Sequence, residues 1–448
     1  MEGEKKIIII GAGLVGSLLA IYLRKRGYKV VLYERRQDMR KVKIPAGRSI
    51  NLALSDRGWR GLEGVGIDDE IRKIGIPMKG RMIHSVEGKI TFQNYGKEEQ
   101  AIYAVSRGIL NCTLLNLAEK NGTEIHFNQR CTSVSLSKNE VHFEHNETSK
   151  KSSATADLIF GADGAFAASR LQLQLSTDKF NYSQTYLEHG YKELMFVANE
   201  NGTHKLEKNA LHIWPRGGYM LIALPNLDGT FTVTLFFPLK GNPSFKMLNT
   251  KESVKKFFNE VFSDAVPLLH SLEEDFFANP TGSLLTVKCS PWSFENKLVL
   301  IGDAAHAIVP FYGQGMNCGF EDCTILNQLI EKHNDDWQKI IPEYEALRKP
   351  AADSIAELAV NNFIEMRDLV GHPDFLLRKK IEGWFYEKHP DKWMPLYSMV
   401  TFSHIPYNEA QERGKKQDKI MDEVMRISGI ENIWNSTEVE RKILGLIK

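Results

Sequence analysis

Three glycines near the N-terminus, Gly11, Gly13 and Gly16, form the pattern G-x-G-x-x-G. The first glycine permits a tight turn, the second lets the backbone approach a pyrophosphate, and the third lets a helix pack closely on the preceding strand. Glu34 lies 18 residues after Gly16, near the spacing of a carboxylate that binds ribose hydroxyls. Although Glu34 could also be a surface residue, this combination predicts a dinucleotide site. It does not choose between NAD and FAD.

Two later segments each place an aspartate two or three residues after a short apolar run. Asp163 follows the run at 158–160, and Asp303 follows the run at 298–301. Such an aspartate, at the carboxyl end of a parallel strand, can accept hydrogen bonds from the ribityl chain of FAD. Each segment alone is compatible with an ordinary strand-to-loop turn. The two together, behind the glycine pattern, favour FAD.

A glycine-rich loop at 310–317 precedes an expected helix that starts at about Cys318. Its free backbone N–H groups could face the flavin pyrimidine and stabilise negative charge there. The loop residues expected at the cofactor are Gly313, Gln314, Gly315, Met316 and Asn317, and the glycine pattern adds Leu14 and Val15. Arg35 could stack on the adenosine half or form an exposed ion pair.

The elements that must position these residues can be read from hydrophobic patterns. Residues 7–11 and 29–33 read as buried parallel strands joined by a helix that ends near Gly27. The runs 212–215, 219–225 and 231–238 read as antiparallel strands, and the chain is helical from about 340. The predicted fold class is α/β, a Rossmann-like FAD-binding domain with an inserted antiparallel β-sheet substrate domain and a C-terminal helical region. The expected boundaries are 1–72, 100–175 and 282–358 for the FAD-binding domain, 73–99 and 176–281 for the substrate domain, and 359–448 for the helical region.

Composition restricts the class of protein. The 448 residues are 25% charged and 42% hydrophobic with a net charge of +1, which gives no indication of nucleic-acid binding. The five cysteines fit no common zinc or redox spacing, so we expect reduced thiols and no metal. No window reaches the roughly 18 apolar residues of a membrane helix. We therefore expect a soluble, cytoplasmic protein.

These motifs together resemble those of the p-hydroxybenzoate-hydroxylase-like FAD monooxygenases. Further segments are similar to the family members that act on the aromatic amino acid kynurenine. The similar segments are 47–55, 211–215, 222–226, 231–236 and 397–403, and the resemblance extends from Lys6 to about Gln417.

The resemblance implies a set of substrate contacts. Arg81 and Tyr95 would hold the amino-acid carboxylate, with further contacts from Asn362 and Tyr397. Taken singly, Arg81 could equally form a surface ion pair and the tyrosines could be core residues. The implied apolar wall consists of Leu211, Ile213, Met220, Phe236 and Phe311, and the implied further FAD contacts are Ala53, Arg107 and Cys131.

The resemblance also implies a reaction. NADPH reduces the flavin, dioxygen adds to give a C4a-hydroperoxide, and an oxygen atom is transferred to L-kynurenine to form 3-hydroxykynurenine. No catalytic acid or base is expected, because the aryl amine already makes the ring nucleophilic. The NADPH site is not located by a second glycine pattern. Two alternatives stay open: a hydroxylase of the same fold for another carboxylated ring, or a flavin-binding sensor without turnover.

Eukaryotic family members continue into a membrane anchor, whereas this chain ends at Lys448. Either a soluble, bacterial-type enzyme or a truncated chain is compatible with that end, and we favour the former. A homodimer is left open.

Overall fold

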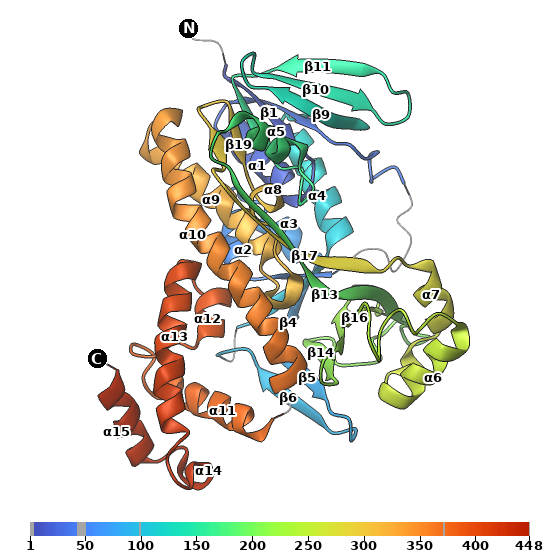
Figure 1. Ribbon diagram of the computed structural model, residues 1–448, viewed down its shortest axis with the longest axis vertical. Coiled ribbons are helices and arrows are strands. Elements are labelled where there is room, and N and C mark those ends of the chain that lie inside the picture. The colour runs from blue at the N-terminus through green and yellow to red at the C-terminus, as the bar shows by residue number, and fades with distance from the viewer. Residues whose placement is uncertain (1–3, 43–50, 98–99, 371, 448) are drawn as a thin grey trace.

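The computed structural model describes residues 4–42, 51–97, 100–370 and 372–447. Its N-terminal part is built on a six-stranded sheet with the order β18-β19-β12-β1-β2-β8, in the upper half of Figure 1. Neighbouring strands run parallel except for the edge pair β18–β19. The strands are β1 (Lys6–Ile10), β2 (Lys29–Tyr33), β8 (Glu124–His126), β12 (Leu158–Gly161), β18 (Ser293–Phe294) and β19 (Leu298–Leu300).

The predicted strand–helix–strand unit at the N-terminus is confirmed. Strand β1 contains four consecutive isoleucines, Ile7–Ile10, with at most 2% exposure, because helices cover both faces of a parallel sheet. Helix α1 (Leu14–Lys25) follows it and packs against α4 (Arg107–Lys120) and α9 (Gly315–Lys332). The carboxyl ends of β1, β2, β12 and β19 therefore meet at one edge of the sheet, where ligands of such folds bind.

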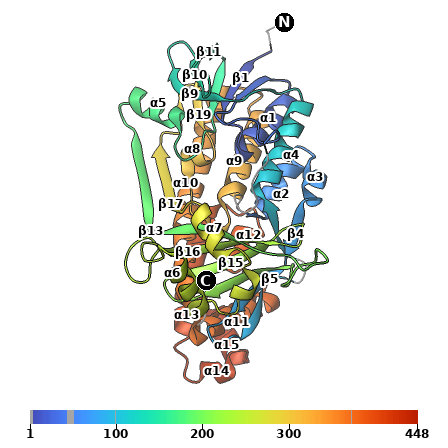
Figure 2. The ribbon, with the colours of Figure 1, turned by 90° about the vertical axis from the view of Figure 1, so that its right-hand side faces the viewer.

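A seven-stranded sheet forms the second part of the molecule, in the order β17-β13-β16-β15-β14-β5-β6. It is antiparallel as predicted, with one exception: β14 and β5 run parallel, because the chain returns to β5 from a distant segment. The strands are β5 (Gly80–His84), β6 (Ile90–Asn94), β13 (Asn181–Phe196), β14 (Ala210–Pro215), β15 (Met220–Pro225), β16 (Phe231–Pro238) and β17 (Gly282–Ser290). In Figure 2, the paired strands β13 and β17 extend from this sheet towards the part that contains the six-stranded sheet.

Two strands lie across the expected domain boundaries. The expected boundary assigns residues from 282 onward to the FAD-binding domain, but β17 pairs with β13 of the seven-stranded sheet. Conversely, β4 (Gly75–Met78) pairs with β7 (Ile102–Ser106), which also pairs with β3 (Asn51–Leu54). A further small sheet contains β9 (Gln129–Ser135), β10 (Glu140–His145) and β11 (Lys151–Thr155).

The predicted helical C-terminal region is present. It begins with α10 (Trp337–Ile364), which continues into a π-helix at Glu365–Leu369. The following helices are α11 (Pro373–Lys388), α12 (Leu396–Thr401), α13 (Tyr407–Val424), α14 (Ile430–Ile433) and α15 (Thr437–Leu446), at the lower left of Figure 1. None of the helices in the described residues is long and apolar enough to cross a membrane. The remaining helices are α2 (Asp56–Glu63), α3 (Asp68–Arg72), α5 (Ala168–Ser176), α6 (Lys251–Val261), α7 (Leu272–Ala278) and α8 (Asp303–His306), and 3-10 turns occupy Val266–Leu268 and Pro310–Tyr312.

A pair of buried histidines lies on the face of the seven-stranded sheet that packs on α6 and α7. His84 Nε2 lies 2.9 Å from His212 Nδ1, and His212 Nε2 lies 2.8 Å from the carbonyl oxygen of Glu207. These two hydrogen bonds assign the tautomers. A neutral His212 donates from Nε2 to the carbonyl oxygen, so its Nδ1 accepts and His84 Nε2 is the donor. His84 Nδ1 is then left unprotonated, 3.6 Å from Asp264.

The free energy of unfolding should decrease as the pH is lowered, because of this histidine pair. Burial, together with the His212 ring, lowers the pKa of His84 from 6.5 to about 4, so the unfolded chain takes up the proton first as pH falls. Between about pH 7.5 and pH 5, we expect His84 to contribute a loss of about 2 kcal/mol in the free energy of unfolding. Urea denaturation at both pH values measures this difference in the free energy of unfolding.

The exposed His270 provides the control for this experiment. His84→Gln should reduce the loss of stability between the two pH values, whereas His270→Gln should keep the wild-type dependence. An unchanged pH dependence in His84→Gln would show that His84 does not carry the effect.

Candidate active site

One cavity of about 960 Å³ connects the edge of the parallel sheet with the seven-stranded sheet. Most of the predicted site residues line it. At the parallel-sheet end these are Gly11, Gly13, Leu14, Val15, Glu34, Arg35, Ala53, Arg107, Cys131, Asp163, Asp303, Gly313, Gly315 and Met316. At the other end they are Arg81, Tyr95, Leu211, Met220, Phe236, Phe311 and Tyr397. Of the similar segment 47–55, residues 47–50 lie outside the described ranges.

The three glycines of the fingerprint have different surroundings. Gly11 has φ +107°, and a Cβ there would lie 2.4 Å from the carbonyl oxygen of Ala162. A Cβ on Gly16 would lie 2.0 Å from the carbonyl oxygen of Gly11, so Gly16 is needed for packing and does not line the cavity. A Cβ on Gly13 would meet no atom within 4 Å and would extend into the cavity. These surroundings fit a cradle for a pyrophosphate.

Glu34 is fixed in place at the end of β2. Its Oε2 accepts a hydrogen bond from the backbone N–H of Ala12 at 2.9 Å, and its Oε1 accepts one from Arg36 Nε at 2.8 Å. Burial opposes ionisation, but Arg36 and the backbone N–H groups outweigh it, so the pKa of Glu34 lies below its ordinary value. Arg35 is exposed at the cavity, and the partner of Glu34 is the neighbouring Arg36, which the sequence reading did not select.

The other predicted cofactor residues differ in their surroundings. Asp163 accepts hydrogen bonds from the hydroxyl and the backbone N–H of Ser169, while burial raises its pKa. Asp303 is the exposed first residue of α8. Burial raises the pKa of Cys131 to about 12, so this thiol stays protonated.

The glycine-rich loop exposes its backbone to the cavity and turns its amide side chains away from it. Asn317 Oδ1 accepts from the backbone N–H of Ser55 at 2.9 Å, and Asn317 Nδ2 donates to the carbonyl oxygens of Ala53 and Gly313. Gln314 is also buried and off the cavity wall. Helix α9 begins at Gly315, three residues before the predicted start, and its N-cap residue Gln314 makes no side-chain capping hydrogen bond.

Arg81, on β5, places a positive charge at the far end of the cavity, and none of the described carboxylates forms a salt bridge with it. Its Nε is buried without a hydrogen-bond partner among the described residues, and the same holds for the hydroxyl of Tyr95. The guanidinium lies 5.4 Å from the Tyr95 ring centre and 5.0 Å from that of Tyr397. Arginine keeps its charge in proteins, so this end of the cavity suits an anionic group.

Two predicted substrate residues, Asn362 and Ile213, do not line the cavity. Asn362 Nδ2 donates to the carbonyl oxygen of Phe311 at 2.7 Å, so Asn362 supports the wall from behind. Ile213 is fully buried within the sheet. Tyr312, which the sequence reading did not select, lines the cavity and stacks on Tyr397 at 5.6 Å. Tyr312 directly follows Phe311 in the loop motif, and this position in the sequence could have indicated that it lines the cavity.

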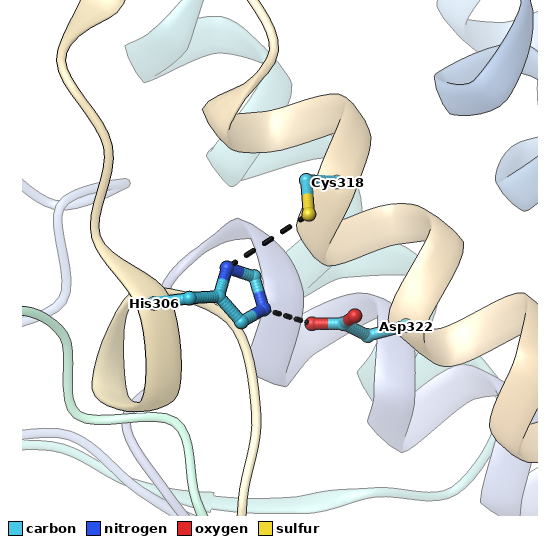
Figure 3. A group of neighbouring side chains, drawn as sticks. All are labelled: His306, Cys318 and Asp322. Atoms are coloured by element: carbon cyan, nitrogen blue, oxygen red, sulfur yellow. Dashed lines mark hydrogen bonds and ion pairs between the residues drawn. The ribbon is translucent and has the colours of Figure 1, made fainter. Parts of the chain in front are cut away.

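A buried ionic cluster lies behind the glycine-rich loop (Figure 3). His306 Nε2 lies 2.6 Å from Asp322 Oδ2, and its Nδ1 lies 3.8 Å from Cys318 Sγ. Burial opposes protonation of the imidazole, but Asp322 outweighs it and raises the pKa of His306.

The spacing of this cluster resembles that of a metal site, but Arg348 supplies the positive charge. Its Nε donates to Asp322 Oδ1 at 2.7 Å, and its Nη2 lies 3.4 Å from Cys318 Sγ. Asp322 Oδ2 also accepts from the backbone N–H of Gly302 at 3.1 Å. The cluster is therefore an ion network that fixes the chain beside Asp303.

Comparisons with known proteins agree with this arrangement. A family described as "FAD binding domain" matches residues 4–359. The kynurenine 3-monooxygenase of Flavobacterium johnsoniae is 54% identical over 448 residues, covering 100% of both chains. That of Anopheles gambiae is 44% identical, covering 95% of this chain and 88% of its own.

Solved structures show the same fold. The tetrameric form of 2-methyl-3-hydroxypyridine-5-carboxylic acid oxygenase has a TM-score of 0.68 at 19% identity, covering 83% of this chain and 94% of its own. PqsL of Pseudomonas aeruginosa, in complex with 2-aminobenzoylacetate, has a TM-score of 0.65 at 18% identity, covering 82% of this chain and 97% of its own. The family match and the full-length identity mean that this chain belongs to the kynurenine 3-monooxygenase family of FAD-dependent aromatic hydroxylases.

Proposed function

We propose that this protein hydroxylates L-kynurenine to 3-hydroxykynurenine, with FAD as its cofactor and NADPH as its reductant. The observation that carries the proposal is Arg81, which has no salt-bridge partner among the described residues and lies at one end of a cavity whose other end is the FAD fingerprint. The names of the full-length relatives support kynurenine as the substrate. An amino-acid carboxylate would supply the anion that Arg81 lacks.

Each end of the proposed substrate has suitable surroundings. The guanidinium of Arg81 can bind a carboxylate through two N–H groups, and the phenols of Tyr95 and Tyr397 can add further bonds. The aromatic ring would then lie among Leu211, Met220, Phe236 and Phe311, between the carboxylate site and the loop that precedes α9. Asn362 would act indirectly, through its bond to Phe311.

FAD, when bound, supplies the redox chemistry by accepting reducing equivalents from NADPH and activating dioxygen. Gly11, Gly13, Glu34, Asp163 and Asp303 would hold it along the edge of the parallel sheet. The free N–H groups at the start of α9 and the positive end of the helix dipole would stabilise negative charge at the flavin end of the cavity. The glycines of the loop keep this backbone accessible.

The remaining task of the chain is to orient the substrate and exclude water. The attacked carbon lies ortho to the aryl amine, whose electrons make the ring nucleophilic, so no side chain has to remove a proton first. Anchoring the carboxylate at Arg81 fixes the distance of the ring from the flavin end. The apolar wall keeps that region dry, which prevents unproductive release of hydrogen peroxide.

Steady-state kinetics of the FAD-loaded enzyme test the proposal. We expect kynurenine to accelerate NADPH oxidation, with formation of one hydroxylated product detected by mass spectrometry. With p-hydroxybenzoate we expect neither effect. Coupled hydroxylation of p-hydroxybenzoate in place of kynurenine would assign the carboxylate site to another ring, and a flavin whose reduction responds to no aromatic amino acid would indicate a sensor.

A further inference from the structure

A segment of the C-terminal region contacts the cavity and the glycine-rich loop at the same time. We call residues 396–407 the linking segment; it comprises α12 and the connection to the first residue of α13 (Figure 1). Tyr397, near its start, lines the cavity beside Arg81. Tyr407, at its end, is fully buried behind the loop. Tyr397 therefore faces the cavity, whereas Tyr407 lies behind the glycine-rich loop and contacts it through Gln314.

Arg57, on α2, holds the linking segment against the FAD-binding part. Its Nε donates to the carbonyl oxygen of Val400 at 3.0 Å, and its Nη2 donates to those of Met399 and Ile405. Its guanidinium also pairs with Glu321 on α9. These bonds satisfy a fully buried arginine side chain and fix the backbone around Tyr407.

The ring and the hydroxyl of Tyr407 have separate partners. The ring lies 4.0 Å beneath the Arg57 guanidinium, close enough for a cation–π contact. The hydroxyl donates to Gln314 Oε1 at 2.8 Å, and Gln314 Nε2 lies 3.3 Å from Ser55 Oγ. Gln314 is the N-cap of α9, directly between Gly313 and Gly315, whose backbone lines the cavity.

We propose that Tyr407 is a positioning residue for the flavin: its hydroxyl fixes Gln314, and thereby the backbone at the start of α9 that faces the cofactor. A glycine on each side of Gln314 leaves this backbone with little restraint of its own. The side-chain bonds from Tyr407 and Ser55 therefore supply the restraint. The consequence for turnover rests on the proposed function, whereas the consequence for the bound flavin does not.

Tyr407→Phe in the FAD-loaded enzyme tests this proposal, because it removes the hydroxyl and keeps the ring against Arg57. We expect FAD to be retained, its visible absorption bands to shift, and the hydroxylated product per NADPH oxidised to fall about threefold to tenfold, as for loss of one buried hydrogen bond. The kynurenine KM should change by less than about twofold, because the Arg81 end is untouched.

Tyr344→Phe is the matched control. Tyr344 is also fully buried, but its hydroxyl has no hydrogen-bond partner among the described residues, so the flavin spectrum and the product ratio should stay as in the wild type. If Tyr407→Phe behaves like Tyr344→Phe in both measurements, the proposal is wrong. A wild-type enzyme that does not hydroxylate kynurenine would contradict the proposed function, while the spectral comparison would still test Tyr407.

Gln314→Leu distinguishes an effect of Tyr407 that acts through Gln314 from a general loss of packing around Tyr407. If Tyr407 acts through Gln314, Gln314→Leu reproduces the spectral shift, and the double variant is no worse than the more affected single variant. Additive losses in the double variant would overturn the proposal. Gln314→Leu also keeps the proposal testable if Tyr407→Phe does not fold.

Discussion

Arg81→Ala is expected to raise the kynurenine KM by about a hundredfold or more, because truncating one member of a buried charge pair removes several kcal/mol of binding. The FAD content should remain that of the wild type, since Arg81 lies at the opposite end of the cavity from the fingerprint. Steady-state kinetics and the absorbance ratio of bound flavin to protein measure the two effects.

Two further substitutions define what Arg81 contributes. Arg81→Lys keeps the charge but cannot make the planar two-pronged contact, so its KM should lie between those of the wild type and Arg81→Ala. Arg72→Ala, on the surface helix α3, removes the same charge from the protein and should leave the KM unchanged. Loss of FAD from Arg81→Ala with an unchanged KM would mean that Arg81 belongs to the cofactor site.

Gly13→Val is expected to weaken FAD binding by about a hundredfold or more without unfolding the protein, because its side chain would occupy the place of the pyrophosphate. A Cβ on Gly13 meets no protein atom within 4 Å, so the apoprotein should keep its wild-type stability. Titration of the apoprotein with FAD, followed by flavin fluorescence, gives the affinity. Thermal unfolding of the apoprotein gives the stability.

Other glycines supply the comparisons for Gly13. Gly383, in α11, also has open space around a Cβ, and Gly383→Val should change neither the FAD affinity nor the apoprotein stability greatly. Gly11→Ala should instead destabilise the apoprotein, because its Cβ would lie 2.4 Å from Ala162 O at a φ of +107°. Normal FAD affinity in Gly13→Val would show that the pyrophosphate does not lie over Gly13.

The parts of the fold that local patterns determine could be predicted from the sequence. The buried run at Ile7–Ile10 and the glycines that follow it specify a strand, a turn and a helix through neighbouring residues alone. The antiparallel strands at Met220–Pro225 and Phe231–Pro238 are likewise close in the chain and joined by a glycine-containing turn. In contrast, the parallel pairing of β5 with β14 joins segments that are far apart, and no local pattern indicates it.

The candidate site was harder to predict from the sequence for the same reason. Resemblance, and not spacing, selected Arg81, Tyr95 and Tyr397, which come from three distant segments and meet only in the folded chain. The orientations of Gln314 and Asn317 depend on Tyr407, Ser55 and Ala53, so the loop sequence alone could not distinguish a cofactor contact from a structural support.

The bonds of Arg57 mean that the C-terminal helices are not a detachable module. Deleting them would remove the carbonyl oxygens that accept from Arg57 and would expose the part of the main core that contains Met399, Val400 and Tyr407. We therefore expect a shortened protein that ends with α10 to be less stable than the whole chain, even though it would contain every strand of the FAD-binding part. Chimaeras between relatives that exchange this region would have to preserve the main chain of α12 and of the turn that follows it, because carbonyl oxygens in both accept hydrogen bonds from Arg57.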